Sequence, residues 1–201
     1  THHHYDHVGG NVELKKKYGS KIVGYETDKK RIPEIDILLK ENQEFKVGGL
    51  NFKTIFIPGH TSGHIAFYLE KEKVVFTGDT LFSLGCGRVF EGTCKEMLES
   101  LNKIKNLPGD TKIYCGHEYT ESNLRFCLRF DPNNKYLKDK EKIIYKMIKE
   151  KKPTIPSLIK DEIQTNIFLR YDDQDIKNAL NLENASDLEI FTKLRDLKDN
   201  F

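Results

Sequence analysis

The chain lacks the features of a membrane protein or a nucleic-acid-binding protein. No apolar run in its 201 residues approaches the roughly 18 residues of a membrane-spanning helix. Its formal net charge is only +2, which does not make a nucleic-acid-binding surface by itself. The lysine-rich stretch 135–152 is the one local basic excess, and its spacing is typical of the solvated face of a helix. We therefore expect neither a membrane nor a nucleic acid among the partners of this protein.

Cysteine pairing motifs are also missing. No two of the four cysteines form a Cys-x-x-Cys pair: they are Cys86, Cys94, Cys115 and Cys127. Such spacing fits reduced thiols in an intracellular protein better than a disulfide framework. We therefore expect a cytoplasmic protein. A mitochondrion or another organelle stays open as an alternative, because a targeting peptide would lie upstream of Thr1.

Histidine, in contrast, is concentrated at the start of the chain. Residues 1–7 read Thr-His-His-His-Tyr-Asp-His and run directly into Gly9-Gly10. Neutral imidazole and carboxylate are ligands that divalent transition metals prefer, so this segment indicates a metal site. A leftover purification tag is the alternative explanation. However, a tag does not usually carry an aspartate inside its histidine run, and it predicts no partner residues further along the chain.

Further candidate ligands each come just after an apolar run of strand-forming residues: His60 and His64 after 52–57, Asp79 after 74–76 and His117 after 113–115. Strands that end in polar ligands are the expected layout of a site built on loops at one edge of a sheet. Any one of these histidines alone is more often an ordinary surface or core residue. Together they predict that the N-terminal histidines and three strand ends form one metal centre.

The first part of the chain alternates strand and helix patterns. Apolar runs predict strands at 22–25, 52–57, 65–69, 74–76 and 112–115. Helices are predicted at 12–18, with Asn11 as its cap and Gly19 at its end, and at about 93–104. Such alternation is typical of a layered α/β domain, which we place at residues 1–117.

The remaining residues, 118–201, have the pattern of a helical unit. Helices are predicted at 118–130, 134–151, 157–163 and 186–197, with breaks at Pro132, Pro153 and Pro156. Ser186 and Glu189 have the spacing of a capping box, which starts the last helix. We therefore expect a small α-helical domain after the α/β domain.

With these residues in place, the whole chain resembles the glyoxalase II (hydroxyacylglutathione hydrolase) family of the metallo-β-lactamase superfamily. The matching segments are 1–11, 60–64, 78–82, 85–88, 115–120 and 195–201. The metal motif alone specifies only the superfamily, whereas the Gly-Cys-Gly-basic segment and the helical second half narrow the match to the glutathione thioesterase branch. The resemblance implies a metallo-β-lactamase αββα sandwich, lacking its first strands here, followed by the helical domain.

The resemblance also implies two groups of metal ligands and a bridge: His2, His4 and His60 for one divalent metal, Asp6, His7 and His117 for a second, and Asp79 between them. His3 would point away along the alternating segment, and His64 would be a structural group behind the ligands. Zinc is the expected metal, and iron or manganese stays open because the same nitrogen and oxygen ligands accept all three.

Two such metals would supply the reaction chemistry without a serine or cysteine nucleophile. Metals about 3.5–4 Å apart share a hydroxide, because each lowers the pKa of bound water towards roughly 7. That hydroxide would attack a thioester carbonyl, and the metals would stabilise the developing oxyanion. A thiol with a pKa of about 8.5 leaves readily. We therefore expect thioester hydrolysis, with Asp79 neutralising charge between the metals and Asp6 orienting the hydroxide.

The substrate implied by the resemblance is S-D-lactoylglutathione, which would be cleaved to glutathione and D-lactate in methylglyoxal detoxification. Glutathione carries two carboxylates, so its site should contain cations. Arg195 and Lys198 lie three residues apart and should share one face of the last helix, although plain surface charge is the alternative. Arg88 and Tyr119 match other glutathione contacts of the family.

Two substrate positions depart from the family pattern. Arg88 stands where lysine is common, which keeps the charge but alters its geometry. Phe90 stands where tyrosine is common, so one hydroxyl contact to glutathione is expected to be absent.

Two other functions stay open from the sequence. A glutathione-persulfide dioxygenase of the same superfamily would hold a single iron, and metal analysis would separate it from a hydrolase. The helical second half ending in Arg195 and Lys198 argues against that enzyme. An inactive scaffold with a structural metal site is the second alternative, although all seven ligand positions are filled.

The position of the metal motif in the chain leads to a last expectation. In the family this motif follows the opening strands of the sheet, whereas here it begins at Thr1. We therefore expect a shortened chain with a bare sheet edge, whose unpaired backbone groups favour self-association. The full-length protein is expected to be a monomer.

Overall fold

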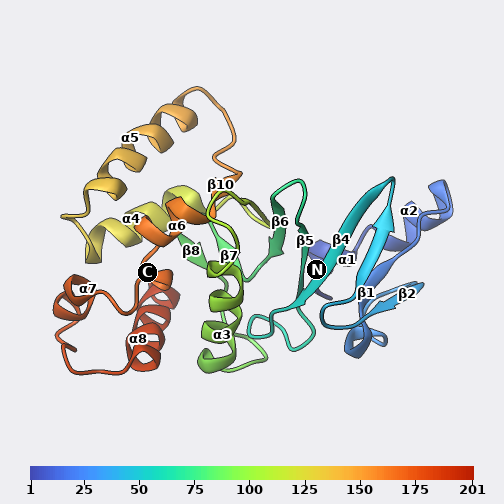
Figure 1. Cartoon of the computed structure of the whole chain (residues 1–201), viewed down its shortest axis with the longest axis horizontal. Helices are drawn as coiled ribbons and strands as arrows, with labels where there is room; N and C mark the ends of the chain where they lie inside the picture. The colour runs from blue at the N-terminus through green and yellow to red at the C-terminus, as the bar shows by residue number, and fades with distance from the viewer.

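A mixed six-stranded sheet forms the centre of the computed structural model, which describes all 201 residues (Figure 1). The strand order is β10-β9-β6-β5-β4-β3. These strands are β3 (Glu44–Val47), β4 (Leu50–Phe56), β5 (Ile65–Leu69), β6 (Val74–Gly78), β9 (Lys112–Cys115) and β10 (Ser157–Leu158). β6 and β9 pair in parallel and the other neighbours pair antiparallel. Consequently β4, β6 and β9 run in the same direction and end at the same edge of the sheet.

Two small sheets complete the β-structure. β1 (Val23–Tyr25) and β2 (Ile37–Leu39) pair in parallel. β7 (Leu81–Phe82) and β8 (Gly85–Cys86) form a short antiparallel hairpin. This hairpin begins two residues after Asp79, so it lies next to the edge where β6 ends.

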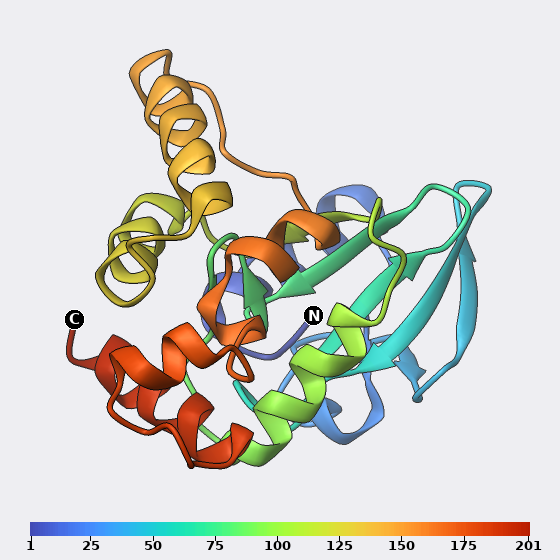
Figure 2. The same cartoon turned by 60° about the vertical axis from the view of Figure 1, so that its left-hand side comes forward.

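Eight α-helices and two 3₁₀ helices surround the strands. They are α1 (Tyr5–Val8), α2 (Asn11–Tyr18), η1 (Glu26–Asp28), α3 (Cys94–Lys105), α4 (Thr120–Phe130), α5 (Lys135–Lys149), α6 (Ile159–Thr165), η2 (Ile167–Leu169), α7 (Gln174–Ala179) and α8 (Asp187–Asp199). α3 packs beside α8, and α4 packs beside α5 (Figure 2). No helix has both the length and the apolar composition needed to cross a membrane.

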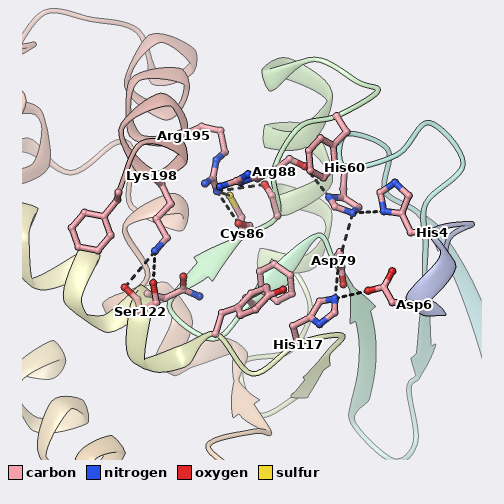
Figure 3. Close-up of a pocket in the computed structure, with 16 residues that line it drawn as sticks. His4, Asp6, His60, Asp79, Cys86, Arg88, His117, Ser122, Arg195 and Lys198 are labelled. Carbon is pink, nitrogen blue, oxygen red and sulfur yellow. Dashed lines mark hydrogen bonds and ion pairs between the residues drawn. The ribbon is translucent and has the colours of Figure 1, made fainter.

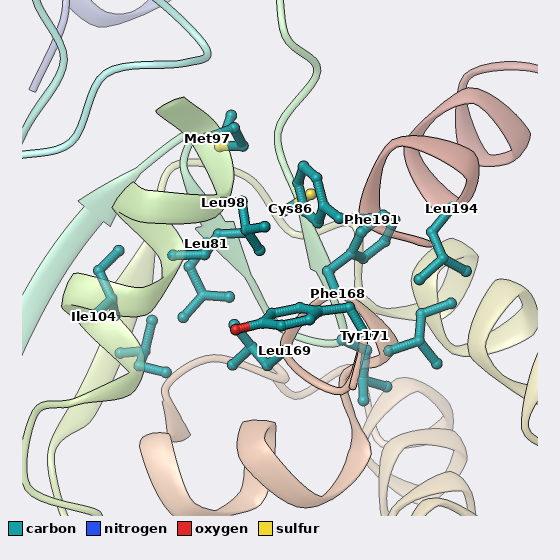
Figure 4. Close-up of a cluster of buried hydrophobic side chains, with 14 of the residues drawn as sticks. Leu81, Cys86, Met97, Leu98, Ile104, Phe168, Leu169, Tyr171, Phe191 and Leu194 are labelled. Atoms are coloured by element: carbon teal, nitrogen blue, oxygen red, sulfur yellow. The ribbon is translucent and has the colours of Figure 1, made fainter. Parts of the chain in front are cut away.

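One hydrophobic core joins the two halves of the chain (Figure 4). Leu81 from the β7–β8 hairpin and Leu98 from α3 lie in the same buried cluster as Phe168, Phe191 and Leu194 from the second half. Burying side chains of this size removes a large apolar area from water, which stabilises the association of the halves. The helical half is therefore packed directly against the hairpin and α3.

The predicted order of an α/β first half and a mainly helical second half is confirmed. β5 and β9 match their predicted ranges, and Gly19 ends α2 in the left-handed conformation with φ +65°. The capping box of Ser186 and Glu189 at the start of α8 is also formed. All four cysteines are free.

Two local predictions were wrong, and some short elements were missed. Asn11 is the first residue of α2 rather than its cap, and its side-chain Nδ2 donates to Pro33 O at 3.2 Å. The helix predicted at 157–163 begins as strand β10, because Ser157 and Leu158 pair with β9 before α6 starts. The shortest elements, such as α1, β7 and β8, were not predicted, since two to four residues carry too little periodic pattern.

Candidate metal centre and substrate pocket

The strand ends bring the candidate ligands to one edge of the sheet. β6 is followed directly by Asp79, β9 by His117 two residues later, and β4 by His60 four residues later. The N-terminal segment reaches the same edge, because Thr1 O accepts a hydrogen bond from the Ile65 N–H at 2.9 Å. The fold therefore joins residues from four separate parts of the chain.

Three imidazole rings form the first group of candidate ligands, those of His2, His4 and His60; Figure 3 shows His4 and His60. His4 Nδ1 lies 3.1 Å from His2 Nε2 and 3.1 Å from His60 Nε2. Two nitrogen ligands on a tetrahedral zinc lie roughly 3.3 Å apart, so these atoms fit one metal ion. His60 Nδ1 lies 2.9 Å from Arg88 O, which can only accept, so Nδ1 carries the proton and Nε2 is left for a metal. Burial lowers the pKa of His2 and His60 and favours the neutral form that binds metals.

Asp6, His7 and His117 form the second group. Asp6 Oδ2 lies 3.1 Å from His117 Nε2 and 3.4 Å from His7 Nε2. Asp79 lies between the groups, with Oδ1 3.4 Å from His7 Nε2 and Oδ2 3.2 Å from His117 Nε2 and 3.6 Å from His60 Nε2. Asp79 Oδ1 and His7 Nε2 are buried without a hydrogen-bond partner, which costs free energy unless an ion satisfies them. These positions fit a second metal that shares Asp79 with the first.

The carboxylate of Asp79 is ionised in this setting. Burial opposes ionisation, but the neighbouring imidazole groups of His7, His117 and His60 outweigh it, so the pKa of Asp79 is lower than usual. An ionised carboxylate with both oxygens directed to histidine groups is suited to bridge two cations.

His64 and His3 lie outside both groups. His64 is fully buried, and its Nε2 accepts a hydrogen bond from the Asp79 backbone N–H at 3.0 Å. His3 Nδ1 lies 3.4 Å from Asp28 Oδ2, and His3 Nε2 lies 3.3 Å from Glu91 Oε1. His64 therefore contacts the backbone of a candidate ligand, whereas His3 contacts two carboxylates outside the metal groups.

A polar network beside His3 was not predicted from the sequence. Arg31 donates to Glu91 Oε1 at 2.8 Å, to Ser62 Oγ at 2.9 Å and to the buried carboxylate of Asp28. Burial opposes ionisation of Glu91, but the hydrogen bonds from Arg31 and Ser62 lower its pKa to about 2. Arg31 and Glu91 lie 60 residues apart in the sequence, so no local pattern could have identified their pairing.

A pocket of about 470 Å³ opens beside the candidate metal centre (Figure 3). All five predicted substrate contacts line it: Arg88, Phe90, Tyr119, Arg195 and Lys198. His4, Asp6, His60, Asp79 and His117 also reach it. Phe82, Ser122 and Asn123 line the same pocket and were not identified from the sequence. Ser122 and Asn123 lie in α4, one helical turn after Tyr119, and could have been found from that spacing.

The two predicted cations of α8 differ in what they can offer a ligand. Arg195 is only 3% exposed, and its guanidinium donates to Cys86 O and to Asp199 Oδ1, both at 2.8 Å. Plain surface charge is therefore the wrong interpretation of Arg195. Lys198 Nζ donates to Ser122 Oγ at 3.1 Å and pairs with no carboxylate. Burial and the nearby charge of Arg195 lower the pKa of Lys198 to about 8, and no paired carboxylate offsets these two effects.

The other three predicted substrate residues expose their side chains. Arg88 Nε lies 3.3 Å from Asp199 Oδ1, and this ion pair is open to solvent. The ring of Phe90 lies 5.2 Å from that of His60, and the ring of Tyr119 stacks on His117 at 5.0 Å. The rings of Phe90 and Tyr119 thus lie next to candidate ligands, and Arg88 lies in the same pocket with only an exposed partner.

Two family models together match the whole chain. Residues 1–117 match the family model of the metallo-β-lactamase superfamily, and residues 118–201 match that of the hydroxyacylglutathione hydrolase C-terminus. A protein of Pelagibacter ubique named hydroxyacylglutathione hydrolase is 55% identical over all 201 residues, which cover 78% of that relative. A relative of the same name from Brucella ovis is 51% identical with the same coverage.

Solved structures share the fold. The BLEG-1 B3 metallo-β-lactamase superimposes with a TM-score of 0.61 at 22% identity, over 84% of this chain and 74% of that one. ETHE1 from Myxococcus xanthus superimposes with a TM-score of 0.64 at 23% identity, over 98% of this chain and 66% of that one. The predicted metallo-β-lactamase fold is therefore confirmed. The two matching family models, and sequence identities of 51–55% over all 201 residues, show that this chain belongs to the hydroxyacylglutathione hydrolase family of the metallo-β-lactamase superfamily.

Proposed function

We propose that this protein hydrolyses the thioester of S-D-lactoylglutathione to glutathione and D-lactate, a step of methylglyoxal detoxification. One observation carries the proposal: the two groups of candidate metal ligands lie at a pocket that also contains Lys198, a cation with no paired carboxylate. The names of the relatives favour a hydrolase over a persulfide dioxygenase or an inactive scaffold.

We further propose two divalent metal ions, with zinc as the most suitable. The ligands would be His2, His4 and His60 for one ion, Asp6, His7 and His117 for the other, and Asp79 for both. When bound, such ions lower the pKa of water towards roughly 7 and polarise a carbonyl group. The Asp79 carboxylate offsets the repulsion between two cations. Asp6 is exposed to the pocket, so one of its oxygens can accept a hydrogen bond from the attacking water and orient it.

Substrate binding is assigned to the residues on the opposite wall of the pocket. Lys198 supplies a charge-assisted hydrogen bond to a carboxylate of glutathione. Arg88 can exchange its exposed partner Asp199 for a second carboxylate, because a solvated ion pair contributes little free energy. Arg195 has one buried donor without a partner, Nε, and its other donors hold the pocket wall at Cys86.

The residues involved support the division into domains at residue 117. All seven proposed metal ligands lie in 1–117, which we propose as the catalytic domain. Tyr119, Arg195 and Lys198 lie in 118–201, which we propose as the substrate-binding helical domain. The continuous hydrophobic core holds the two parts together.

A turnover assay beside metal analysis of the same sample tests this function. We expect loss of the thioester of S-D-lactoylglutathione and close to two metals per chain. The D-lactoyl thioester of N-acetylcysteamine, which lacks both carboxylates and has no free amine to attack the thioester, is the matched control and should react with a much higher KM. One iron per chain with oxygen uptake on glutathione persulfide would establish the dioxygenase instead, and bound metal without any turnover would establish a scaffold.

A further inference from the structure

The turn of the β7–β8 hairpin is held by side chains of the helical half. Asn166 Nδ2 donates to Gly85 O at 3.1 Å and to Phe82 O at 3.3 Å. Glu162 Oε2 accepts a hydrogen bond from the Leu84 N–H at 2.7 Å. Glu162 and Asn166 are completely buried, and neither lines the substrate pocket. Two α4 side chains add to these contacts: Asn123 Nδ2 donates to Ser83 O at 3.0 Å, and Cys127 Sγ donates to Leu84 O at 3.2 Å.

Glu162 is a buried carboxylate with every oxygen in use. Oε1 accepts from Lys140 Nζ at 2.6 Å and lies 3.4 Å from Ser83 Oγ, while Oε2 also accepts from Asn166 Nδ2 at 3.1 Å. A buried ion pair adds little net stability over an apolar pair of the same size, because both charges lose their hydration. The geometry that Glu162 imposes on the turn is therefore a better explanation of its position than its contribution to stability.

The turn needs support from outside the hairpin. Leu84 has φ +59°, a left-handed conformation that a bulky residue rarely adopts and that persists only when the surroundings hold it. Its backbone N–H and C=O bond to Glu162 and Cys127 rather than across the hairpin. The strands on either side of the turn carry Phe82 and Cys86, which line the pocket.

The opposite end of the hairpin has separate anchors at the candidate metal centre. The Gly87 N–H donates to Thr80 O at 3.1 Å, and Arg88 O accepts from His60 Nδ1 at 2.9 Å. Loosening the turn should thus move the pocket wall more than the metal ligands.

We propose that Glu162 and Asn166 are positioning residues: they hold the turn 82–85 and thereby fix the wall that Phe82 and Cys86 present to the glutathione part of the substrate. The identity of that ligand rests on the proposed function, but the control of the turn does not. The helical half then shapes the pocket through buried contacts to this hairpin as well as through α8.

The test compares Glu162→Ala with Glu162→Gln in the metal-loaded protein. Glutamine keeps an oxygen acceptor for the Leu84 N–H, and Lys140 is close enough to the surface to turn into solvent. Asn166→Ser is a second variant, because serine retains the cap for the Phe168 N–H but loses the donors to the turn. Tyr171→Phe is the control, since it removes a hydrogen bond to Asn102 in which no residue of the hairpin takes part.

Three measurements are made on each variant: amide hydrogen exchange at residues 82–85, binding of the thioether S-hexylglutathione by calorimetry, and KM and kcat with S-D-lactoylglutathione. We expect Glu162→Ala and Asn166→Ser to speed exchange and to raise Kd and KM roughly tenfold, equivalent to about 1.4 kcal/mol. Metal content and kcat should stay within about twofold, and Glu162→Gln should restore near-normal values.

Unchanged exchange and Kd in both Glu162→Ala and Asn166→Ser would overturn the proposal. An equal rise of Kd in Tyr171→Phe would also overturn it, because general destabilisation would then explain the effect. If Glu162→Ala does not fold, Asn166→Ser decides between these results. If the unmodified protein binds but does not hydrolyse the thioester, the proposed function fails, while exchange and Kd still decide the role of the turn.

Discussion

Replacing Lys198 by methionine tests how the pocket recognises an anionic substrate. Lys198 Nζ lies half-buried on the pocket wall, donates to Ser122 and pairs with no carboxylate of the protein. A hydrogen bond between this cation and a substrate carboxylate should contribute about 1.5–3 kcal/mol. Since about 1.4 kcal/mol corresponds to a factor of ten, Lys198→Met should raise KM for S-D-lactoylglutathione roughly tenfold or more. The value of kcat should change much less, because the contact is remote from the carbon that is attacked.

The pH dependence of KM provides the second part of this test. Burial and the charge of Arg195 lower the pKa of Lys198 to about 8. Lysine attracts a carboxylate only while protonated, so the KM of the unmodified protein should rise as the pH increases through about 8. Lys198→Met should lack that rise, and Lys198→Arg should keep a low KM above it. Burial disfavours the protonated lysine in the folded state below pH 8, so Lys198→Met should not lower Tm at pH 7. A KM within twofold of normal in Lys198→Met, or the same pH-dependent rise, would refute the reasoning.

Three further predictions follow from the site. Asp79→Ala should remove the carboxylate that both ligand groups face, lowering metal content below two per chain and abolishing most activity; a fully active protein with one metal would contradict the two-metal proposal. Arg195→Ala should leave the buried Cys86 carbonyl without its donor and lower the free energy of unfolding by about 1–3 kcal/mol, measured by denaturant titration. Arg88→Ala breaks only an exposed ion pair and should lower the same free energy by less than about 1 kcal/mol. Equal losses would show that Arg195 does not hold the pocket wall. Phe90→Tyr should restore the missing hydroxyl and lower KM by roughly two- to tenfold, and an unchanged KM would mean that the hydroxyl finds no partner.

The sequence by itself determined the features that depend on short-range patterns. The apolar runs of β5 and β9 carry enough strand-forming residues to define their ranges, and the Ser186–Glu189 spacing defines the start of α8. The placement of Asp79 and His117 directly after strands indicated a shared site, because strand ends meet at a sheet edge. Each of these inferences starts from a short segment of the chain, such as a ligand and the strand that it follows.

Only the tertiary structure decided which distant residues contact one another. Arg195 became a buried donor to Cys86 O because α8 packs on the β7–β8 hairpin, 109 residues away in sequence. Strand β10 formed where a helix was predicted, because Ser157 and Leu158 complete the ladder beside β9. The contact of Glu162 with Leu84 has the same origin: a free backbone N–H in a left-handed turn must be satisfied, and only the folded chain brings a carboxylate to it.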